Sequence, residues 1–155
     1  MSNMQGLFRA LIQGYELVRR QGAGPLQKEI LSNFADWAAQ GYVFAASAAG
    51  RIAAIGIAGP VTANTLNAKG AKTMPKDFDR AEGRRIYCAY ALVDKKYRGR
   101  LGATLLAEMT KAARDSFPDC TSLVYARALR GDDRLREKPF KRDLIASEVE
   151  DDNGL

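Results

Sequence analysis

Apolar residues recur every three or four positions through the first forty residues of the chain. One run extends from Leu7 to Val18 and ends before the glycine- and proline-containing segment 22–25. A second run extends from Leu26 to Ala38 and is followed by Gly41. This spacing places apolar side chains on one face of a helix, and glycine and proline are common stop signals. The sequence therefore predicts two successive amphipathic helices.

Three later segments have the composition of strands or of their connections. Residues 42–47 and 52–58 are β-prone and flank the turn 48–50, which predicts a hairpin. Residues 86–93, IYCAYALV, form a continuous apolar run too short for a typical helix, so they predict a central strand. Residues 59–85 show no sustained period, which predicts a long connection, either a functional loop or a disordered insertion.

A helix and a strand follow the central strand. Apolar residues between Leu101 and Ala113 have helical spacing, Pro118 marks the end of that helix, and residues 121–128 have strand composition. The order strand, glycine-containing loop, helix, strand gives a right-handed crossover if the two strands are parallel neighbours. The predicted fold class is α/β (α+β), a mixed, twisted central sheet flanked by helices, in the single domain expected of 155 residues.

Composition excludes several classes of chemistry and location. The chain has no histidine, which excludes Ser-His-Asp and Cys-His nucleophiles and His-ligated zinc. Its two cysteines, Cys88 and Cys120, form no CxxC pair, so we expect buried thiols and no metal. Every apolar stretch is interrupted by Gly, Arg or Lys, which predicts no contact with a membrane, and no secretory signal is recognisable, which predicts a cytoplasmic location.

The segment between the central strand and the following helix combines glycines with positive charge. It holds Arg98, Gly99, Arg100 and Gly102 at the start of a new helix. The first turn of a helix has unpaired N–H groups, glycines let a phosphate approach them, and guanidinium groups add charge-assisted hydrogen bonds. The segment is either an anion cradle or simply a tight strand-to-helix turn. A net charge of +6 is compatible with ligand phosphates or a polyanionic partner.

The same residues resemble a known family. Residues 93–106, VDKKYRGRLGATLL, resemble the acyl-CoA loop of the GNAT N-acetyltransferase superfamily, V-D-P-E-Y-R-G-x-G-x-G-x-x-L-L. Residues 41–58 resemble the preceding hairpin, and residues 121–129, TSLVYARAL, resemble the strand after the helix. The loop is one residue shorter than the pattern, so it is a degenerate pyrophosphate loop, and the family's usual first strand is missing.

The resemblance implies a GNAT-like domain over residues 1–147, followed by an acidic C-terminal tail over residues 148–155. It implies acetyl-CoA as co-substrate, with the pyrophosphate on the loop and the pantetheine arm on the end of the central strand. The cofactor-binding candidates are Leu92, Val93, Arg98, Gly99, Arg100, Gly102 and Ala103.

Catalytic candidates are fewer. The family commonly protonates the leaving thiolate with a tyrosine, but none aligns in residues 134–140. Tyr90 and Tyr125 are substitute acids, although a strand tyrosine more often fills the core. Cys88 has no histidine to activate it and lies in an apolar run, so packing is the better interpretation.

Three functional hypotheses remain. The first is an acyl-CoA-dependent N-acyltransferase that moves an acetyl group to an unidentified amine, bound by residues 7–40 and 59–85, whose basic side chains would suit an acidic acceptor. The second is a non-catalytic module of the same fold, acting in a protein assembly or homo-oligomer, for example in a phage particle. The third, supported only by charge, is a nucleic-acid-binding or DNA-modifying relative.

Overall fold

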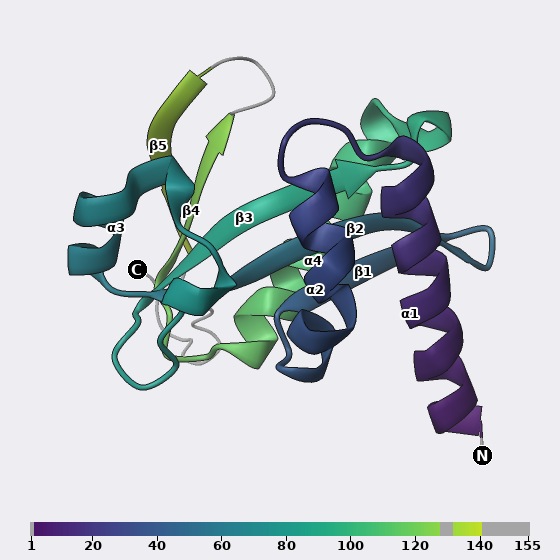
Figure 1. The fold of residues 1–155 in the computed structure, drawn as a ribbon, viewed down its shortest axis with the longest axis horizontal. Coiled ribbons are helices and arrows are strands. Elements are labelled where there is room, and N and C mark those ends of the chain that lie inside the picture. Colours follow the sequence, from purple (N-terminus) through teal and green to yellow (C-terminus); the bar gives the residue numbers. More distant parts are fainter. Residues whose placement is uncertain (1, 128–131, 141–155) are drawn as a thin grey trace, which may run out of the picture.

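The computed structural model describes residues 2–127 and 132–140. Figure 1 shows its helices and strands in order along the chain. The helices are α1 (Ser2–Gln21), α2 (Gln27–Ala39), α3 (Ala63–Lys69) and α4 (Arg100–Ser116), and the 3-10 turns are η1 (Gly70–Lys72), η2 (Pro75–Asp77) and η3 (Lys95–Tyr97). The strands are β1 (Val43–Ala48), β2 (Arg51–Val61), β3 (Arg85–Val93), β4 (Ser122–Arg127) and β5 (Asp132–Pro139).

The five strands form one mixed sheet in the order β1-β2-β3-β4-β5. Neighbours are antiparallel except β3 and β4, which are parallel and are joined through α4. The α/β class, the opening helices, the hairpin, the central strand and the strand–helix–strand crossover are thus confirmed. In the described chain α1 is the first element, and β1 forms one edge of the sheet.

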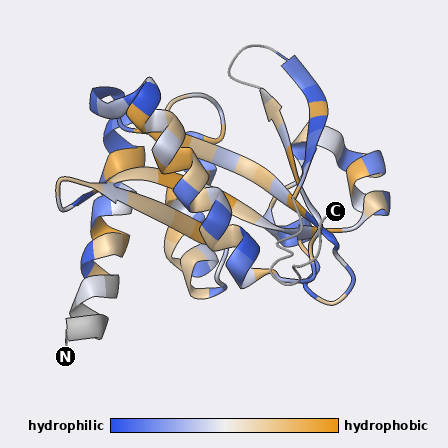
Figure 2. Cartoon of the chain, turned by 180° about the vertical axis from the view of Figure 1, so that it is seen from behind, coloured by the Kyte–Doolittle hydropathy of each residue, from blue (hydrophilic) through white to orange (hydrophobic). Residues whose placement is uncertain are grey.

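Helices cover both faces of the sheet (Figure 1). Gly14 of α1 lies against Ile55 of β2, whereas Gly56, the next residue of that strand, faces Met109 of α4. The alternation of side chains along β2 therefore supplies apolar groups to both layers. Figure 2 shows the resulting hydrophobic character of the central strands. Leu17 and Val18 of α1 are fully buried in this core.

The connection over residues 59–85 is more regular than its composition suggested. Strand β2 continues to Val61, and the chain then forms α3, η1 and η2. Thr62 caps α3, because its hydroxyl accepts a hydrogen bond from the Thr65 N–H at 3.1 Å. Leu66 is the one buried residue of this helix. The alternative of a disordered insertion is therefore wrong: a side-chain cap and apolar contacts that follow no period, among them those of Leu66, Pro75 and Phe78, order the segment.

Strand β5 was not predicted from the sequence. Its residues, DDRLREKP, are polar on both faces, as the largely hydrophilic ribbon in Figure 2 shows. It pairs with β4 from Ser122↔Pro139 to Arg127↔Asp132. A strand that buries almost no apolar side chain lacks the period-two signal.

Two features bear on the predicted boundaries. The acidic tail, residues 148–155, lies outside the described residues, as do residues 141–147, so the domain limit stays a prediction. None of the helices in the described part of the chain is long and apolar enough to cross a membrane.

We predict that Leu17→Ala lowers the free energy of unfolding by about 2–5 kcal/mol, because it leaves a cavity beneath α1 at a fully buried position. Ile12→Ala is the matched control, since this side chain of the same helix is 55% exposed and its loss should cost less than about 1 kcal/mol. Urea denaturation measures both. Equal effects would contradict the packing of α1 described above.

Candidate functional site

Strands β3 and β4 pair over a short distance only. Their register contains three residue pairs, from Arg85↔Ser122 to Tyr87↔Val124. Beyond Tyr87 the two strands separate, as Figure 1 shows. Among the described strands, none pairs with the edge of β3 over residues 88–93 on the β4 side. Such an edge carries backbone N–H and C=O groups that an extended, amide-containing ligand can bind.

A bulge lies in β3 just after this separation. Ile57 pairs with Tyr90 and Ala58 pairs with Cys88, so Ala89 is the extra residue. A bulge turns the following side chains and increases the local twist. It brings Tyr90 to the sheet face covered by α1 and α2.

The loop after β3 leads to the first turn of α4. Gly99, the residue before the helix, has φ +103° and no heavy atom within 4 Å of where a Cβ would be. The backbone N–H groups of residues 99–102 have no acceptor among the described residues, whereas that of Ala103 donates to the Gly99 carbonyl at 3.0 Å. Four adjacent donors at the positive end of a helix dipole form an anion-binding geometry.

The predicted loop residues take different positions. Arg98 and Arg100 are exposed, and Arg98 Nε donates to the Val93 carbonyl at 3.1 Å. Gly102 is buried, and a Cβ there would lie 3.0 Å from the Tyr97 carbonyl oxygen. The side chain of Leu92, near the end of β3, is buried in the hydrophobic core. The structure thus brings the predicted cofactor-binding residues together at one place.

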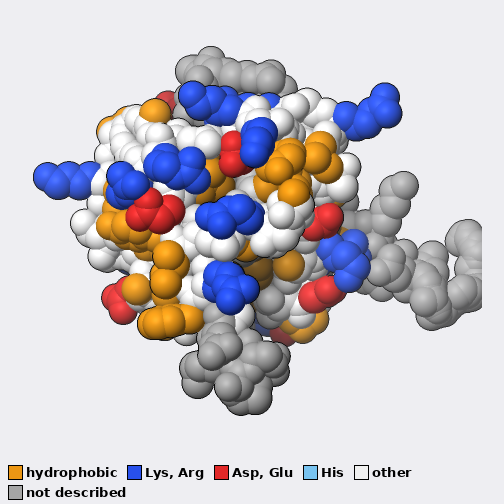
Figure 3. Space-filling view, turned by 90° about the vertical axis from the view of Figure 1, so that its right-hand side faces the viewer, with side chains coloured by type: hydrophobic (Ala, Val, Ile, Leu, Met, Phe, Trp, Pro, Cys, Tyr) orange, Lys and Arg blue, Asp and Glu red, His pale blue; other side chains and the backbone are white. Residues whose placement is uncertain are grey.

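Positive charge surrounds this loop. Lys95, Lys96, Arg98 and Arg100 are all exposed, and none has a carboxylate within ion-pair distance in the described residues. Figure 3 views the molecule from the end where the loop lies and shows Lys and Arg side chains spread over that face. An anion approaching the free N–H groups would be attracted by these charges.

Gln21, the last residue of α1, is a site residue that the sequence did not reveal. Its side-chain amide donates to Asp94 Oδ1 at 3.0 Å, and its oxygen accepts from the Lys95 N–H at 2.9 Å. Asp94 also accepts from the Lys96 N–H at 3.0 Å. The hydrogen bond from Gln21 is the main cause that lowers the pKa of Asp94. Gln21 therefore connects α1 to the loop across 73 positions of sequence, a distance over which no local signal exists.

Tyr90 places a buried hydroxyl beside the end of α1. Its oxygen is inaccessible to solvent and has no hydrogen-bond partner among the described residues. A Cβ on Gly22 would lie 2.9 Å from this oxygen, so the α1–α2 connection covers it. Burial raises the pKa of Tyr90, so the hydroxyl stays protonated at neutral pH and can donate a hydrogen bond.

The other candidates are less suited to catalysis. Tyr125 is partly buried and follows Val124, which packs with Tyr87 beside α3. Because side chains alternate along a strand, Tyr125 points to the opposite face, and the structure does not bring it together with Tyr90. The Cys88 thiol donates to the Tyr90 carbonyl at 3.5 Å, and burial raises its pKa to about 11. Cys88 is only partly buried, whereas a fully buried thiol was expected, and its raised pKa makes it a poor nucleophile.

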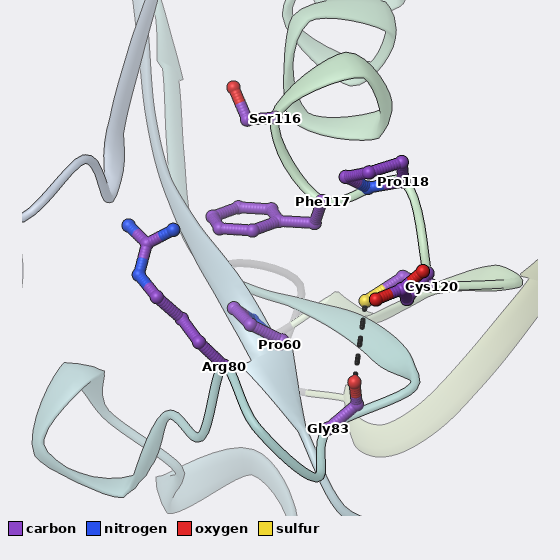
Figure 4. Close-up of a pocket in the computed structure, with 8 residues that line it drawn as sticks. Pro60, Arg80, Gly83, Ser116, Phe117, Pro118 and Cys120 are labelled. Atoms are coloured by element: carbon purple, nitrogen blue, oxygen red, sulfur yellow. Dashed lines mark hydrogen bonds between the residues drawn. The ribbon is translucent and has the colours of Figure 1, made fainter.

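A small hollow of about 170 Å³ lies at the far end of α4 (Figure 4). The Arg80 guanidinium lies 4.9 Å from the ring of Tyr42 and 5.0 Å from that of Phe117. The Cys120 thiol donates to the Gly83 carbonyl at 3.8 Å, and burial raises its pKa to about 11. These contacts connect the loops around this end of the sheet, so the Arg80 guanidinium and the Cys120 thiol already have partners within the protein.

No group of three or more His, Cys, Asp or Glu residues in the described part of the chain could hold a metal ion.

Comparisons with known proteins concern the fold alone. No protein-family model and no curated protein matches the chain. A solved structure described as a "putative acetyltransferase" from Staphylococcus aureus Mu50 matches 82% of this chain and 75% of its own, with 12% identity and a TM-score of 0.43. An acetyltransferase of Trypanosoma brucei matches 87% of this chain and 93% of its own, with 21% identity and a TM-score of 0.40. Both are similarities to solved structures that are described as acetyltransferases. At these values the similarity says nothing about activity.

We predict that Gln21→Ala releases the loop without unfolding the protein. The Lys95 N–H loses its acceptor, so its hydrogen exchange should become about tenfold faster. Gln13→Ala is the matched control, because Gln13 accepts from the Ile52 N–H at 2.9 Å on the same helix. The control should accelerate exchange at Ile52 and leave Lys95 unchanged, and an unchanged Lys95 in Gln21→Ala would contradict the proposed link.

The loop should also respond to acid. The pKa of Asp94 is lowered in the folded protein, so its stabilising hydrogen bonds are present above the ordinary carboxyl pKa of about 3.9 and are lost as the pH falls through the lowered value. Hydrogen exchange at Lys96 should therefore accelerate below about pH 4 relative to amides of β2. In Gln21→Ala this change should begin at a higher pH, and NMR titration measures both.

Proposed function

We propose that the protein is an acyl-CoA-dependent N-acyltransferase. The observation that carries the proposal is the set of four unpaired N–H groups at residues 99–102, which open on a basic surface directly after a strand with a free edge. Acyl-CoA has a matching chemistry, because its pyrophosphate is a double anion and its pantetheine arm contains amides. The open space at Gly99 allows a phosphate to approach the backbone closely.

Each part of the site has a separate task. The N–H groups of α4 bind the pyrophosphate, and Arg98 and Arg100 supply additional positive charge. The free edge of β3 over residues 88–93 holds the amide-containing arm in an extended conformation. Acyl-CoA supplies an activated thioester, whose acyl group passes to a neutral amine as the N–C bond forms and the C–S bond breaks.

The proposed acyl transfer needs the thioester and the amine to be held in a productive orientation, and it needs one proton donor for the leaving thiolate. Fixing the two reactants in a productive geometry contributes roughly 7–11 kcal/mol to many bimolecular reactions. The amine loses a proton to solvent, and the departing thiolate gains one. Tyr90 is the better of the two candidate acids, because its hydroxyl is protonated and unpartnered beside the bulge of β3, and the α1–α2 connection that covers it at Gly22 must move aside for it to reach the thiolate.

A second candidate function is a non-catalytic interaction module. It is favoured by exposed apolar side chains on α1, where Phe8 is 67% exposed and Ile12 is 55% exposed. Exposed apolar groups on one helix face are typical of a contact surface. Acetyl-CoA binding distinguishes the two, because a module would have no need of the cofactor.

Nucleic-acid binding is less well supported. The cation-rich strand β5 pairs its arginines internally, with Arg134 and Arg136 at 3.7 and 3.0 Å from Asp132. Arg85 of β3 likewise pairs with Glu137 at 3.1 Å. Charges that are already compensated contribute little to phosphate binding.

We predict that the protein binds acetyl-CoA in isothermal titration calorimetry and that Gly102→Glu abolishes the binding. The new side chain would meet the Tyr97 carbonyl and place a negative charge among the pyrophosphate donors. Gly6→Glu introduces the same charge in open space on α1 and should bind normally. Absence of heat with the folded wild type at millimolar ligand would overturn the transferase proposal.

We predict that Tyr90→Phe lowers kcat about 10²-fold with little change in KM for acetyl-CoA, because it removes only the proton donor. Tyr125→Phe, on the opposite face of the sheet, should leave kcat within about twofold of the wild type. Acetyl transfer to an accepted amine, followed by thiol release, measures both. The reverse pattern would transfer the acid role to Tyr125.

A further inference from the structure

A cavity of about 500 Å³ lies between the start of α2 and the segment that contains α3, η1 and η2. It is large enough for a small organic molecule. Its wall consists of Leu26, Glu29, Ala68, Lys69, Ala71, Lys72, Met74 and Lys76. Four of these residues are apolar and three are lysines.

The charge of the cavity is unbalanced. Lys69 is paired with Asp77, which lies behind the wall, at 3.1 Å between Nζ and Oδ1. Lys72 and Lys76 have no carboxylate within ion-pair distance among the described residues. Glu29 is the one acidic residue of the wall. Ammonium groups that converge on a hollow without partners favour an anionic ligand.

One hydrogen bond connects this cavity to strand β3. The Tyr87 hydroxyl donates to the carbonyl of Ala71, a wall residue, at 3.1 Å. Leu26, another wall residue, belongs to the α1–α2 connection that covers the Tyr90 hydroxyl through Gly22. The cavity therefore adjoins strand β3 at Tyr87, the last residue of that strand that pairs with β4.

We infer that this cavity binds the acceptor of the proposed transferase and that the acceptor is a primary amine with an anionic group at its other end. The inference rests on the proposed function. Lys72 and Lys76 bind the anionic group, and Leu26 and Met74 contact the hydrocarbon chain between the two ends. The amine, which must be neutral to react, is then directed away from the lysines and toward strand β3.

The test compares three probes of one chain length by calorimetry. They are 5-aminopentanoate, which has an amine and a carboxylate, pentylamine, which lacks the carboxylate, and 1,5-diaminopentane, which has a second cation instead. We expect 5-aminopentanoate to bind at least about tenfold more tightly than the other two. Equal binding of pentylamine would overturn the inference.

Matched variants locate the binding. Lys72→Met/Lys76→Met should weaken 5-aminopentanoate about tenfold, whereas Lys28→Met/Lys111→Met, which removes the same charge outside the cavity wall, should not. If both double variants weakened the binding of 5-aminopentanoate equally, the effect would be one of overall charge, and the assignment of the binding site to this cavity would be overturned.

Acetyl-CoA binding to the same samples separates the two proposals. If acetyl-CoA binds and 5-aminopentanoate does not, the acceptor inference fails and the transferase remains. If 5-aminopentanoate binds at the lysines and acetyl-CoA does not, the proposed function and the acceptor role both fail, and the cavity is an anion site of a different kind of protein. If both bind, acetylation of 5-aminopentanoate but not of pentylamine at equal concentration is the expected result.

Discussion

The organisation of this protein depends on how strand β3 is paired. Along its length β3 is bonded to β2, but it meets β4 over three residue pairs only. The β4–β5 hairpin consequently turns away from the rest of the sheet (Figure 1). Because β4 is connected to β3 through α4, the same separation places the first turn of α4 beside the unpaired part of β3. A free strand edge and a helix N-terminus thus adjoin one another as a result of topology.

Two glycines and one glutamine give this junction its form. At Gly99 the backbone adopts a positive φ that L side chains rarely adopt, and this conformation leads directly into α4. At Gly102 the missing side chain lets the helix lie close to the Tyr97 carbonyl. At the end of this loop, four N–H groups have no acceptor among the residues that the structure describes. Gln21 then fixes the start of the loop to α1, so the helix layer and the loop are mechanically connected.

The sequence predicted the parts of the fold that bury periodic apolar residues, and it predicted a basic, glycine-containing loop before α4, whose role in binding stays a prediction. The two opening helices, the hairpin and β3 all have such periods. Strand β5 has none, because Leu135 is its one large apolar residue and its charges pair across the strands. Helix α3 depends on a cap at Thr62 and a single buried Leu66. Gln21 could not be recognised, since its partners become neighbours only after the helix and the sheet have packed together.

Some basic side chains of this protein form ion pairs and others do not, and this difference determines where an anion is expected to bind. Arginines on and beside β5 are paired with Asp132 and Glu137. Residues 95–100 and the lysines Lys72 and Lys76 have no such partners among the described residues. A net charge of +6 spread evenly would favour any polyanion. Uncompensated charge at the end of β3 and in a cavity that adjoins the same strand instead favours anions at two particular places on the molecule.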